Sequence, residues 1–351
     1  MAIRWALLGP GRHAERSVVA ALKAAAGGEL VALFSRDPSR GESFARAHGI
    51  PRVYTAFEEL LRDRDIDALY DATPDGLHAA HAIAAARAGK HALIEKPLAI
   101  SVAEGAAAIA AARRHNVKLG VVFNQRHEAV HQEARRLLRD GALGEVKLAL
   151  VQIPLQRTIR VAAPASPQAN WRVDPQMRPG GIAVSIGDHA YDTLAYILGQ
   201  EIAEVSAFTD ASRMDPPNEQ VAAMLLKLAH GTIGYATASF ATPFARRPFE
   251  FHGTKGSLIV ENSYTYLTGA DGGARPKLTL INEAGSKAQD FAPTDCFRLE
   301  IERFNRAIAG AGEPMTTAAE GLRSLAIASA LYAAIREGRV AQIAEFMPQS
   351  E

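Results

Sequence analysis

The chain has 351 residues, of which 48% are hydrophobic and 22% charged, and its formal net charge is +1. This length predicts two domains, and the balanced charge argues against nucleic acid or an anionic membrane surface as a partner. The chain has one cysteine, Cys296, and no apolar run near the roughly 18 residues of a membrane-spanning helix. We therefore expect a cytoplasmic protein without disulfides and without a metal site.

The first third of the chain alternates strand-like and helix-like segments. Such alternation is typical of parallel βαβ units. The predicted strands are 3–8, 30–34, 68–71, 91–94 and 118–122, and the predicted helices are 12–26, 38–48, 76–88 and 102–115. Residues 1–122 are therefore predicted to form a Rossmann-type NAD(P)-binding domain with a doubly wound parallel sheet.

A glycine-rich turn, Gly9-Pro10-Gly11-Arg12-His13-Ala14, follows the first predicted strand and fits the pattern G-x-G-x-x-G/A. The first glycine permits the tight turn, the second lets the backbone approach a pyrophosphate, and the small last residue lets helix and strand pack closely. The helix N-terminus then faces the phosphates. Because the motif lies between a strand and a helix, it predicts a dinucleotide cofactor rather than a plain turn.

The tip of the second predicted strand indicates which dinucleotide is bound. Ser35 and Arg36 stand where an NAD site usually has an acid, and Arg40 is close by. An arginine at this place accommodates the 2′-phosphate of NADP. Asp37 comes one or two places late and is expected to cap the following helix. We therefore predict that NADP(H) is favoured over NAD(H).

The segment Glu95-Lys96-Pro97 follows a short apolar strand, 92–94. Ligands bind at the carboxyl ends of strands in open α/β sheets, and a charged lysine there needs a partner or a role. The alternative is a solvated lysine at a strand end. Together with Thr73-Pro74-Asp75-x-x-His78 and the segment 88–91, this segment resembles the glucose-fructose oxidoreductase, inositol dehydrogenase and rhizopine-catabolism family, Gfo/Idh/MocA.

The resemblance continues through segments 123–126, 171–172, 179–181 and 187–192. It implies that Lys96 and His189 lie beside the nicotinamide, that Lys96 binds or protonates the reacting oxygen, and that the Lys96–Pro97 bond is cis. The residues assigned to the cofactor are Gly9, Pro10, Gly11, Arg12, His13, Ala14, Ser35, Arg36, Arg40, Thr73, Pro74, Asp75, His78, Glu95, Lys96, Trp171 and Arg172. Those assigned to the substrate are Lys96, Asn124, Arg126, Asp188, His189 and Asp192.

The sequence departs from the family pattern at Ser185, where an aspartate often stands four residues before the histidine. On a helix these two positions share a face, so the aspartate would line the same pocket. Serine cannot accept a proton at neutral pH, which weakens a Lys/Asp/His triad and leaves Lys96 with more of the proton handling. Asp192 is expected to orient the imidazole, and Asp188 to cap the helix or contact substrate. A satisfied core histidine is the alternative for His189.

The remainder, 123–351, resembles the family's substrate and dimerisation domain, an α/β domain with a large, mostly antiparallel sheet. Successive strand candidates with short turns support this sheet. They are 146–153, 205–208, 221–228, 232–240, 249–251, 258–261 and 277–281. The segment 123–144 is expected to be a connecting helix, 154–170 a loop on the substrate side, and about 316–337 a helix that packs back on the first domain. The free face of the sheet is a candidate surface for a homodimer or homotetramer.

These features predict an NAD(P)-dependent oxidoreductase that transfers hydride between nicotinamide C4 and a secondary alcohol or ketone of a sugar or cyclitol. Within the family, the pairs Ser35-Arg36 and Trp171-Arg172 and the stretch 249–258 look most like 1,5-anhydro-D-fructose reductases, which favours ketone reduction. One alternative is a sugar dehydrogenase or an NAD-dependent glycoside-cleaving relative. Another alternative is a non-catalytic NADP-binding sensor. The presence of both Lys96 and His189 argues against it.

Overall fold

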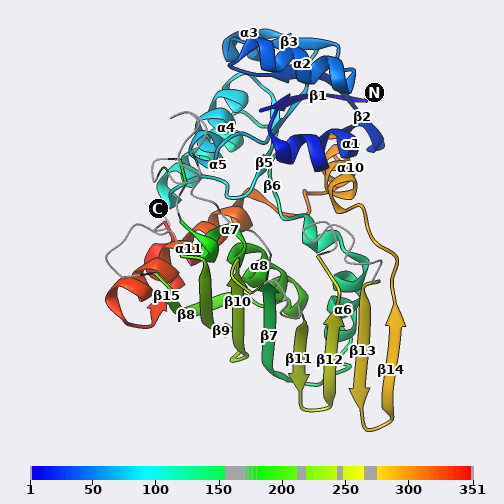
Figure 1. Cartoon of the computed structure of the whole chain (residues 1–351), viewed down its shortest axis with the longest axis vertical. Helices are drawn as coiled ribbons and strands as arrows, with labels where there is room; N and C mark the ends of the chain where they lie inside the picture. Colours follow the sequence, from blue (N-terminus) through cyan, green and yellow to red (C-terminus); the bar gives the residue numbers. More distant parts are fainter. Residues whose placement is uncertain are drawn as a thin grey trace.

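The computed structural model describes residues 2–154, 171, 174, 177–178, 180–211, 219–242, 248–264 and 275–348. Two sheets dominate it, one parallel and one mostly antiparallel, with helices between them (Figure 1). The predicted fold class, a Rossmann sheet followed by an α/β domain with a large antiparallel sheet, is confirmed.

The first sheet has six strands in the order β3-β2-β1-β4-β5-β6, and every neighbouring pair is parallel. This is the strand order of dinucleotide-binding folds, whose ligands lie at the carboxyl ends of the strands. The strands are β1 (Ile3–Leu8), β2 (Gly28–Phe34), β3 (Arg52–Tyr54), β4 (Ala68–Asp71), β5 (His91–Glu95) and β6 (Leu119–Val122). The strand β3 was not predicted, because it has only three half-buried residues and no apolar run.

Both faces of this sheet are covered. In β1, Trp5 and Leu7 pack into the core on one face, and Ala6 and Leu8 into the core on the other. The flanking elements are the π-helical turn η1 (Ala14–Val18), α1 (Val19–Ala24), α2 (Pro38–His48), α3 (Phe57–Arg62), the turn η2 (Asp75–Leu77), α4 (His78–Arg87) and α5 (Val102–Arg114). Asp37 caps α2 as predicted, since its side chain accepts a hydrogen bond from the Arg40 amide at 3.1 Å.

The second sheet has nine strands in the order β14-β13-β12-β11-β7-β10-β9-β8-β15, and among its described pairs only β7 and β10 run parallel. The strands are β7 (Val146–Pro154), β8 (Ile202–Thr209), β9 (Val221–Leu228), β10 (Ile233–Ser239), β11 (Phe249–Gly253), β12 (Gly256–Glu261), β13 (Lys277–Asn282), β14 (Gly285–Asp290) and β15 (Ala341–Gln342). The strand β14 was not expected, because it is polar and fully exposed at the sheet edge.

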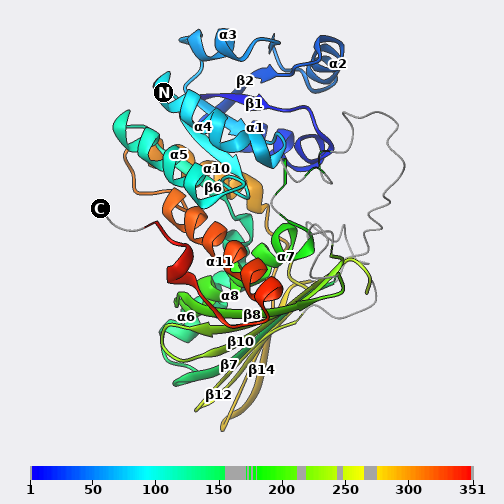
Figure 2. The same ribbon diagram turned by 90° about the vertical axis from the view of Figure 1, so that its left-hand side faces the viewer.

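Helices cover the face of the second sheet that looks toward the first sheet, as Figure 2 shows for α6, α8 and α11. The elements of this layer are η3 (Asn124–His127), α6 (Ala129–Arg139), α7 (Ile182–Ser185), α8 (Gly187–Leu198), α11 (Ala318–Glu337) and η6 (Ile343–Phe346). Leu322 and Leu325 of α11 join the core beneath the first sheet. By length and composition α11 could cross a membrane, but 67% of its most apolar window is buried, as in the core helix of a globular fold.

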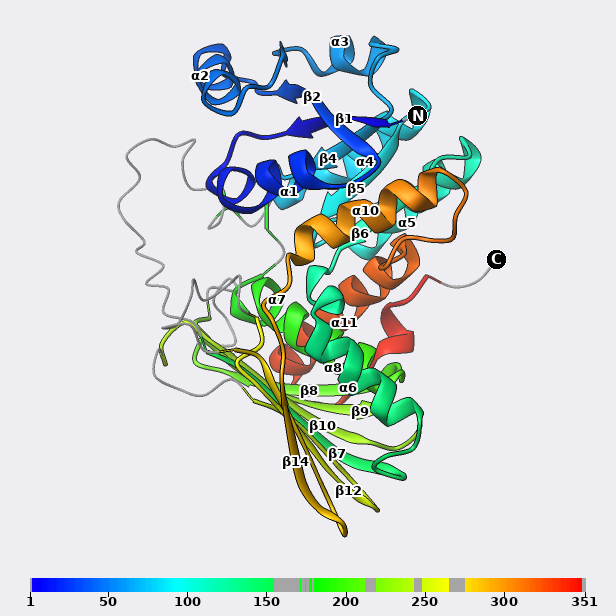
Figure 3. The ribbon, with the colours of Figure 1, turned by 90° about the vertical axis from the view of Figure 1, so that its right-hand side faces the viewer.

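A helix that the sequence analysis did not predict, α10 (Cys296–Ile308), returns to the first sheet and lies beside α1 (Figure 3). Phe297, Ile301 and Phe304 enter the core around Trp5. Asn305 accepts a hydrogen bond from the Trp5 indole nitrogen at 2.9 Å. A segment from the last sixth of the chain therefore completes the cover of the nucleotide-binding sheet.

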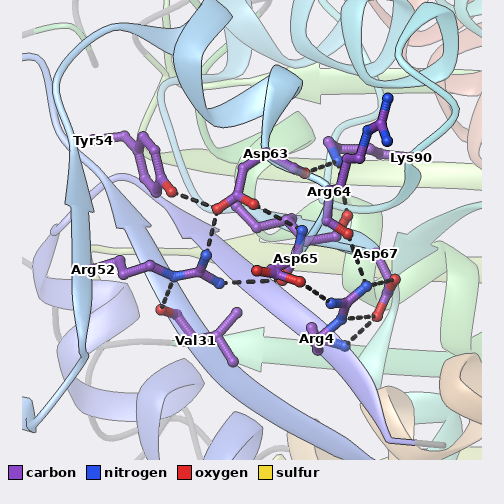
Figure 4. A network of polar contacts seen from close by, with 10 residues as sticks. Arg4, Val31, Arg52, Tyr54, Asp63, Arg64, Asp65, Asp67 and Lys90 are labelled. Carbon is purple, nitrogen blue, oxygen red and sulfur yellow. Dashed lines mark hydrogen bonds and ion pairs between the residues drawn. The ribbon is translucent and has the colours of Figure 1, made fainter.

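The amino edge of the first sheet is tied by a charged network (Figure 4). The Arg4 guanidinium binds both oxygens of Asp67, at 2.9 and 2.8 Å, and Arg52 pairs with Asp63. Lys90 donates to the carbonyls of Asp63 and Ile66 at 2.7 and 2.8 Å. A hollow of about 440 Å³ lies beside this network. It is at the edge opposite the carboxyl ends of the strands, so it is not the candidate site.

Candidate functional site

The glycine turn after β1 has the shape that a dinucleotide requires. Gly9 has a φ of 91°, and a Cβ there would lie 3.1 Å from the Ala72 carbonyl oxygen. A Cβ on Gly11 would meet no atom within 4 Å, so open space lies over this residue. Ala14 is fully buried at the start of η1. The turn therefore leaves room for a pyrophosphate against backbone amides and fits the cofactor expected there.

The tip of β2 presents an exposed guanidinium beside this turn. Arg36 is exposed, whereas Ser35 is buried and its hydroxyl donates to the Asp37 carbonyl at 2.7 Å. Arg40 donates to the Pro10 carbonyl at 2.8 Å and so ties α2 to the glycine turn. Of the three residues expected to contact the cofactor here, Arg36 and Arg40 are both exposed and charged, and Arg40 also ties α2 to the turn through Pro10.

A buried carboxylate that the sequence analysis did not assign holds the loop after β4. Asp71 has no exposed surface and accepts hydrogen bonds from the Thr73 amide at 3.0 Å and the Thr73 hydroxyl at 2.6 Å. Its second oxygen faces His81 Nδ1 at 2.8 Å. The loop also touches the second part of the chain, because the Gly76 amide donates to the Met177 carbonyl at 2.9 Å. The loop carrying Thr73, Pro74 and Asp75 is thus fixed from both sides.

His78 links two loops at the carboxyl edge of the sheet. It is fully buried, with Nδ1 2.7 Å from the Pro97 carbonyl oxygen and Nε2 3.0 Å from that of Thr73. Burial opposes its charge, but the nearby carboxylates of Asp71 and Asp75 and the two carbonyls raise its pKa overall. His78 therefore ties the loop after β4 to the turn after β5, and its contact with the cofactor stays a prediction.

The carboxyl end of β5 joins the glycine turn through Glu95. His13 Nε2 lies 2.6 Å from a Glu95 oxygen, and the Tyr70 hydroxyl donates to the same oxygen at 2.7 Å. Burial opposes the charge of this carboxylate, but His13 and Tyr70 outweigh it and lower its pKa. The turn after β1 and the strand that carries Lys96 are therefore held together by charged and hydrogen-bonding groups.

Lys96 reaches across to α7 and α8 from the end of β5. The Lys96–Pro97 bond is cis, and Lys96 Nζ donates to the Ser185 carbonyl at 2.6 Å. The same ammonium pairs with Asp188, at 3.3 Å from Oδ1 and 3.2 Å from Oδ2. The Lys96 side chain keeps 15% of its surface exposed, whereas that of Asp188 keeps 2%. The lysine thus has a carboxylate partner and remains accessible.

His189 lies next to this pair at the start of α8. It is 4% exposed, and burial lowers its pKa well below the usual value, with the nearby charges of Lys96 and His13 acting in the same direction. The imidazole is therefore neutral at neutral pH. Lys96 and His189 come from different parts of the chain and meet at the carboxyl edge of the parallel sheet.

Asp192 and Arg126 form a buried ion pair. The two oxygens of Asp192 accept hydrogen bonds from Arg126, at 3.0 Å from Nε and 2.6 Å from Nη2, and Arg126 also binds Glu320 at 2.5 Å. Arg126 is 7% and Asn124 1% exposed. This ion pair links η3 and α8 to the start of α11. The contacts expected of Asp192 with the imidazole and of Arg126 with substrate stay predictions.

Ser185 and His189 also do not share a continuous helix. The short helix α7 ends at Ser185, and α8 begins at Gly187 after Ile186 with a φ of −128°. Hydrogen bonds between residues far apart in sequence also hold α7 in place. The Tyr332 hydroxyl accepts from the Gly181 amide at 2.8 Å and donates to Glu219 at 2.7 Å. Because of the break at Ile186, Ser185 offers Lys96 its carbonyl, and Asp188 supplies the carboxylate.

The expected contacts from the loop before α7 lie mostly outside the described residues. Arg172 and the segment 155–170 are among these, and Trp171 is partly exposed. Within the described ranges, no group of three or more histidine, cysteine, aspartate or glutamate residues is arranged to hold a metal ion.

A second buried acid lies on α10, behind the site. Glu300 is 1% exposed, and burial raises its pKa to about 8, with Arg126 opposing. His127 Nε2 lies 3.6 Å from it, and burial and nearby arginines lower the pKa of that imidazole to about 4. Both groups are therefore neutral near pH 7. No local pattern indicated this pair, because its two residues come from segments more than a hundred residues apart.

The Glu300→Gln substitution tests this burial. In the wild type, the unfolded chain releases the carboxyl proton near the ordinary pKa of 4.5, while the folded chain keeps it up to about 8. The free energy of unfolding therefore falls as pH rises through this window, by roughly 1.4 kcal/mol per pH unit at most. We expect the variant to have a higher Tm than the wild type at about pH 8.5 and an equal Tm at about pH 4, below the ordinary pKa of the carboxyl.

Thermal unfolding followed by circular dichroism across this range makes the measurement. The control is Glu283→Gln, at an exposed position in the β13–β14 turn, which should leave Tm unchanged at every pH. A Tm difference for Glu300→Gln that does not depend on pH would contradict a buried, neutral carboxyl.

Comparison with known proteins agrees with this geometry. A family model described as oxidoreductase family, NAD-binding Rossmann fold, matches residues 3–123. A second, the GFO/IDH/MocA C-terminal domain, matches residues 131–259. The two matches together span well over half of the chain.

Characterised and solved relatives match along nearly the whole length. The 1,5-anhydro-D-fructose reductase of Ensifer adhaerens is 33% identical over 342 residues, which cover 97% of this chain and 98% of the relative. The inositol 2-dehydrogenase of Rhizobium meliloti (strain 1021) is 30% identical over 98% of this chain and 100% of the relative. The structure of aldose-aldose oxidoreductase from Caulobacter crescentus complexed with glycerol has a TM-score of 0.85 at 26% identity, covering 97% of this chain and 100% of that chain.

Proposed function

The chain belongs to the Gfo/Idh/MocA family of NAD(P)-dependent oxidoreductases that act on CH–OH groups, and from this we propose that it uses NADPH to reduce the ketone of a sugar or cyclitol derivative. A 1,5-anhydro-D-fructose-like ketone is the first candidate substrate, since the reductase of that name is a relative over the whole chain.

The observation that carries the proposal is the meeting of Lys96 with Asp188 and His189 at the carboxyl edge of the Rossmann sheet. The nicotinamide supplies the hydride when the cofactor is bound. The Lys96 ammonium donates a hydrogen bond to the reacting carbonyl oxygen and then a proton, which balances the negative charge that hydride addition creates there. The neutral imidazole of His189 makes the second polar contact to that oxygen.

Arg36 supports NADPH as the preferred cofactor. It is exposed at the tip of β2, where the adenosine ribose lies in dinucleotide-binding folds. A guanidinium binds a 2′-phosphate through charge-assisted hydrogen bonds. Ser35 and Arg40 hold the turn from which Arg36 extends.

The Arg36→Ala variant should bind NADPH roughly 10-fold or more weakly, because a hydrogen bond to a charged group contributes about 1.5–3 kcal/mol. Its affinity for NADH should change little. Fluorescence titration with both cofactors measures the two dissociation constants. Arg46→Ala, at an exposed position on the same helix, is the matched control. Unchanged NADPH affinity in Arg36→Ala would remove the arginine from cofactor selection.

A panel of ketones tests the reaction itself. Wild-type protein is mixed with NADPH or NADH and with 1,5-anhydro-D-fructose, other keto sugars and keto-inositols, while the 340 nm absorbance is followed. We expect loss of NADPH absorbance with at least one ketone. Turnover only in the reverse direction, with sugars or cyclitols and NADP, would favour the dehydrogenase alternative. Tight NADPH binding without turnover in either direction would favour a non-catalytic sensor.

The outer face of the second sheet is the surface through which we propose that the chain forms a homodimer or homotetramer. We also propose that the protein is cytoplasmic. Phe208 is 71%, Leu225 54% and Ile233 45% exposed, and none of the described helices covers this face (Figure 2). Contiguous exposed apolar side chains mark association surfaces. The single cysteine fits a reducing compartment.

A further inference from the structure

The carboxylate that faces Lys96 comes from an unexpected position. Ser185 reaches Lys96 only through its backbone carbonyl, at 2.6 Å from Nζ, and its hydroxyl is buried without a hydrogen-bond partner in the described part of the chain. Three residues later, both oxygens of Asp188 lie 3.2–3.3 Å from the same Nζ. The break in the backbone at Ile186 makes this arrangement possible.

Asp188 is held by a backbone amide while both of its oxygens face the lysine. Oδ1 accepts hydrogen bonds from the His189 amide at 2.7 Å and from Lys96 at 3.3 Å, and Oδ2 lies 3.2 Å from Lys96 Nζ. Burial raises the pKa of Asp188 to about 6, although Lys96 lowers it. The Asp188 carboxyl is thus mostly ionised at neutral pH, and the ion pair with Lys96 stabilises it because an unpaired buried charge is costly.

We propose that Asp188 is the positioning carboxylate of the active site, which keeps Lys96 protonated and aimed at the reacting oxygen, in place of an acid at position 185. This rests on the proposed function. Asp188 acts through Lys96, whose exposed fraction of 15% leaves the ammonium accessible to substrate, whereas Asp188 itself is nearly inaccessible.

Other charged groups around the pair do not take this role. Glu95, next to Lys96 on β5, is bound to His13 and Tyr70. On α8, Asp192 is bound to Arg126, and Asp192 raises the pKa of Asp188 rather than neutralising Lys96. His189 is neutral, and the Tyr191 hydroxyl is buried with a pKa well above its usual value.

The test uses Asp188→Asn, which keeps the shape and removes the charge. In this variant the partly buried ammonium of Lys96 has lost its counter-charge and should release its proton at lower pH. We expect kcat for ketone reduction to fall by about 10²-fold at pH 8. The alkaline limb of the kcat–pH profile should move to lower pH by about one unit or more. The NADPH dissociation constant should change less than about threefold.

A rescue variant separates a change of charge from damage to the fold. Ser185→Asp added to Asp188→Asn places a carboxylate on the residue whose carbonyl already contacts Lys96. The double variant should have a kcat about tenfold or more above that of Asp188→Asn alone. The alkaline limb of its pH profile should return toward the wild-type pH. A loss of kcat in Asp188→Asn without a shift of the limb and without rescue would overturn the inference, as would a near-normal rate.

A measurement without turnover distinguishes this inference from the proposed function. Only the unprotonated amine of lysine reacts with acetic anhydride, so the pH dependence of Lys96 acetylation, read by mass spectrometry, reports its charge. The acetylation curve of Asp188→Asn should lie at lower pH than that of the wild type. If the wild type reduces no ketone but the curve shifts, the proposed reaction fails and the pairing stands. If the curve does not shift, the pairing role fails whatever the activity.

Discussion

Replacing Lys96 by methionine should lower turnover by about 10²-fold or more, while NADPH binds within a few-fold of its wild-type affinity. Methionine fills a similar volume but cannot donate the hydrogen bond or the proton. The cofactor turn at Gly9–Ala14 is held through His13 and Glu95, which the substitution leaves in place. Single-turnover reduction and NADPH fluorescence titration together separate the chemical step from binding.

The matched control is Lys90→Met, at the opposite end of β5. Lys90 is also buried, but it donates to backbone carbonyls at the amino edge of the sheet. This variant should lose stability and keep the kcat of its folded fraction. A near-normal rate in Lys96→Met, or an equal loss of kcat in Lys90→Met, would remove Lys96 from the mechanism.

Filling the space over Gly11 should abolish most cofactor binding. An added Cβ meets no atom within 4 Å, so Gly11→Val is expected to fold normally. Its side chain would occupy the space that a pyrophosphate needs to reach the backbone amides at the start of η1. Loss of one or two charge-assisted hydrogen bonds, at about 1.5–3 kcal/mol each, corresponds to an NADPH affinity about 10²-fold lower.

Gly11→Ala is the comparison variant. It should lose less NADPH affinity than Gly11→Val, and both variants should keep the same Tm. Isothermal titration and thermal unfolding measure the two quantities. Wild-type affinity in Gly11→Val would show that the dinucleotide does not pass over this turn.

Local patterns predicted much of the molecule. The apolar runs and the glycine turn were sufficient for five of the six strands of the parallel sheet, because a strand buried on both faces must be apolar throughout. The cap at Asp37 was predictable from a side chain that satisfies a nearby amide. The approach of Lys96 and His189 followed from motif resemblance, and the structure places both at one edge of the sheet.

Long-range partners could not be predicted in the same way. Trp5 and Asn305 are 300 positions apart, and nothing local indicates that α10 returns to the first sheet. The expectation for Ser185 assumed a continuous helix, which the break at Ile186 removes. Which carboxylate reaches Lys96 therefore depended on tertiary structure rather than on helical spacing.

Deuterium transfer from the cofactor to a ketone measures directly whether Lys96 takes part in hydride transfer. Wild-type protein and Lys96→Met are incubated with NADPH that carries deuterium at nicotinamide C4 and with the ketone panel, and the products are analysed by mass spectrometry. We expect one deuterium on the new carbinol carbon with the wild type, and transfer slowed by about 10²-fold or more in the variant. Tight NADPH binding with no deuterium in any product, or equal transfer by both proteins, would contradict it.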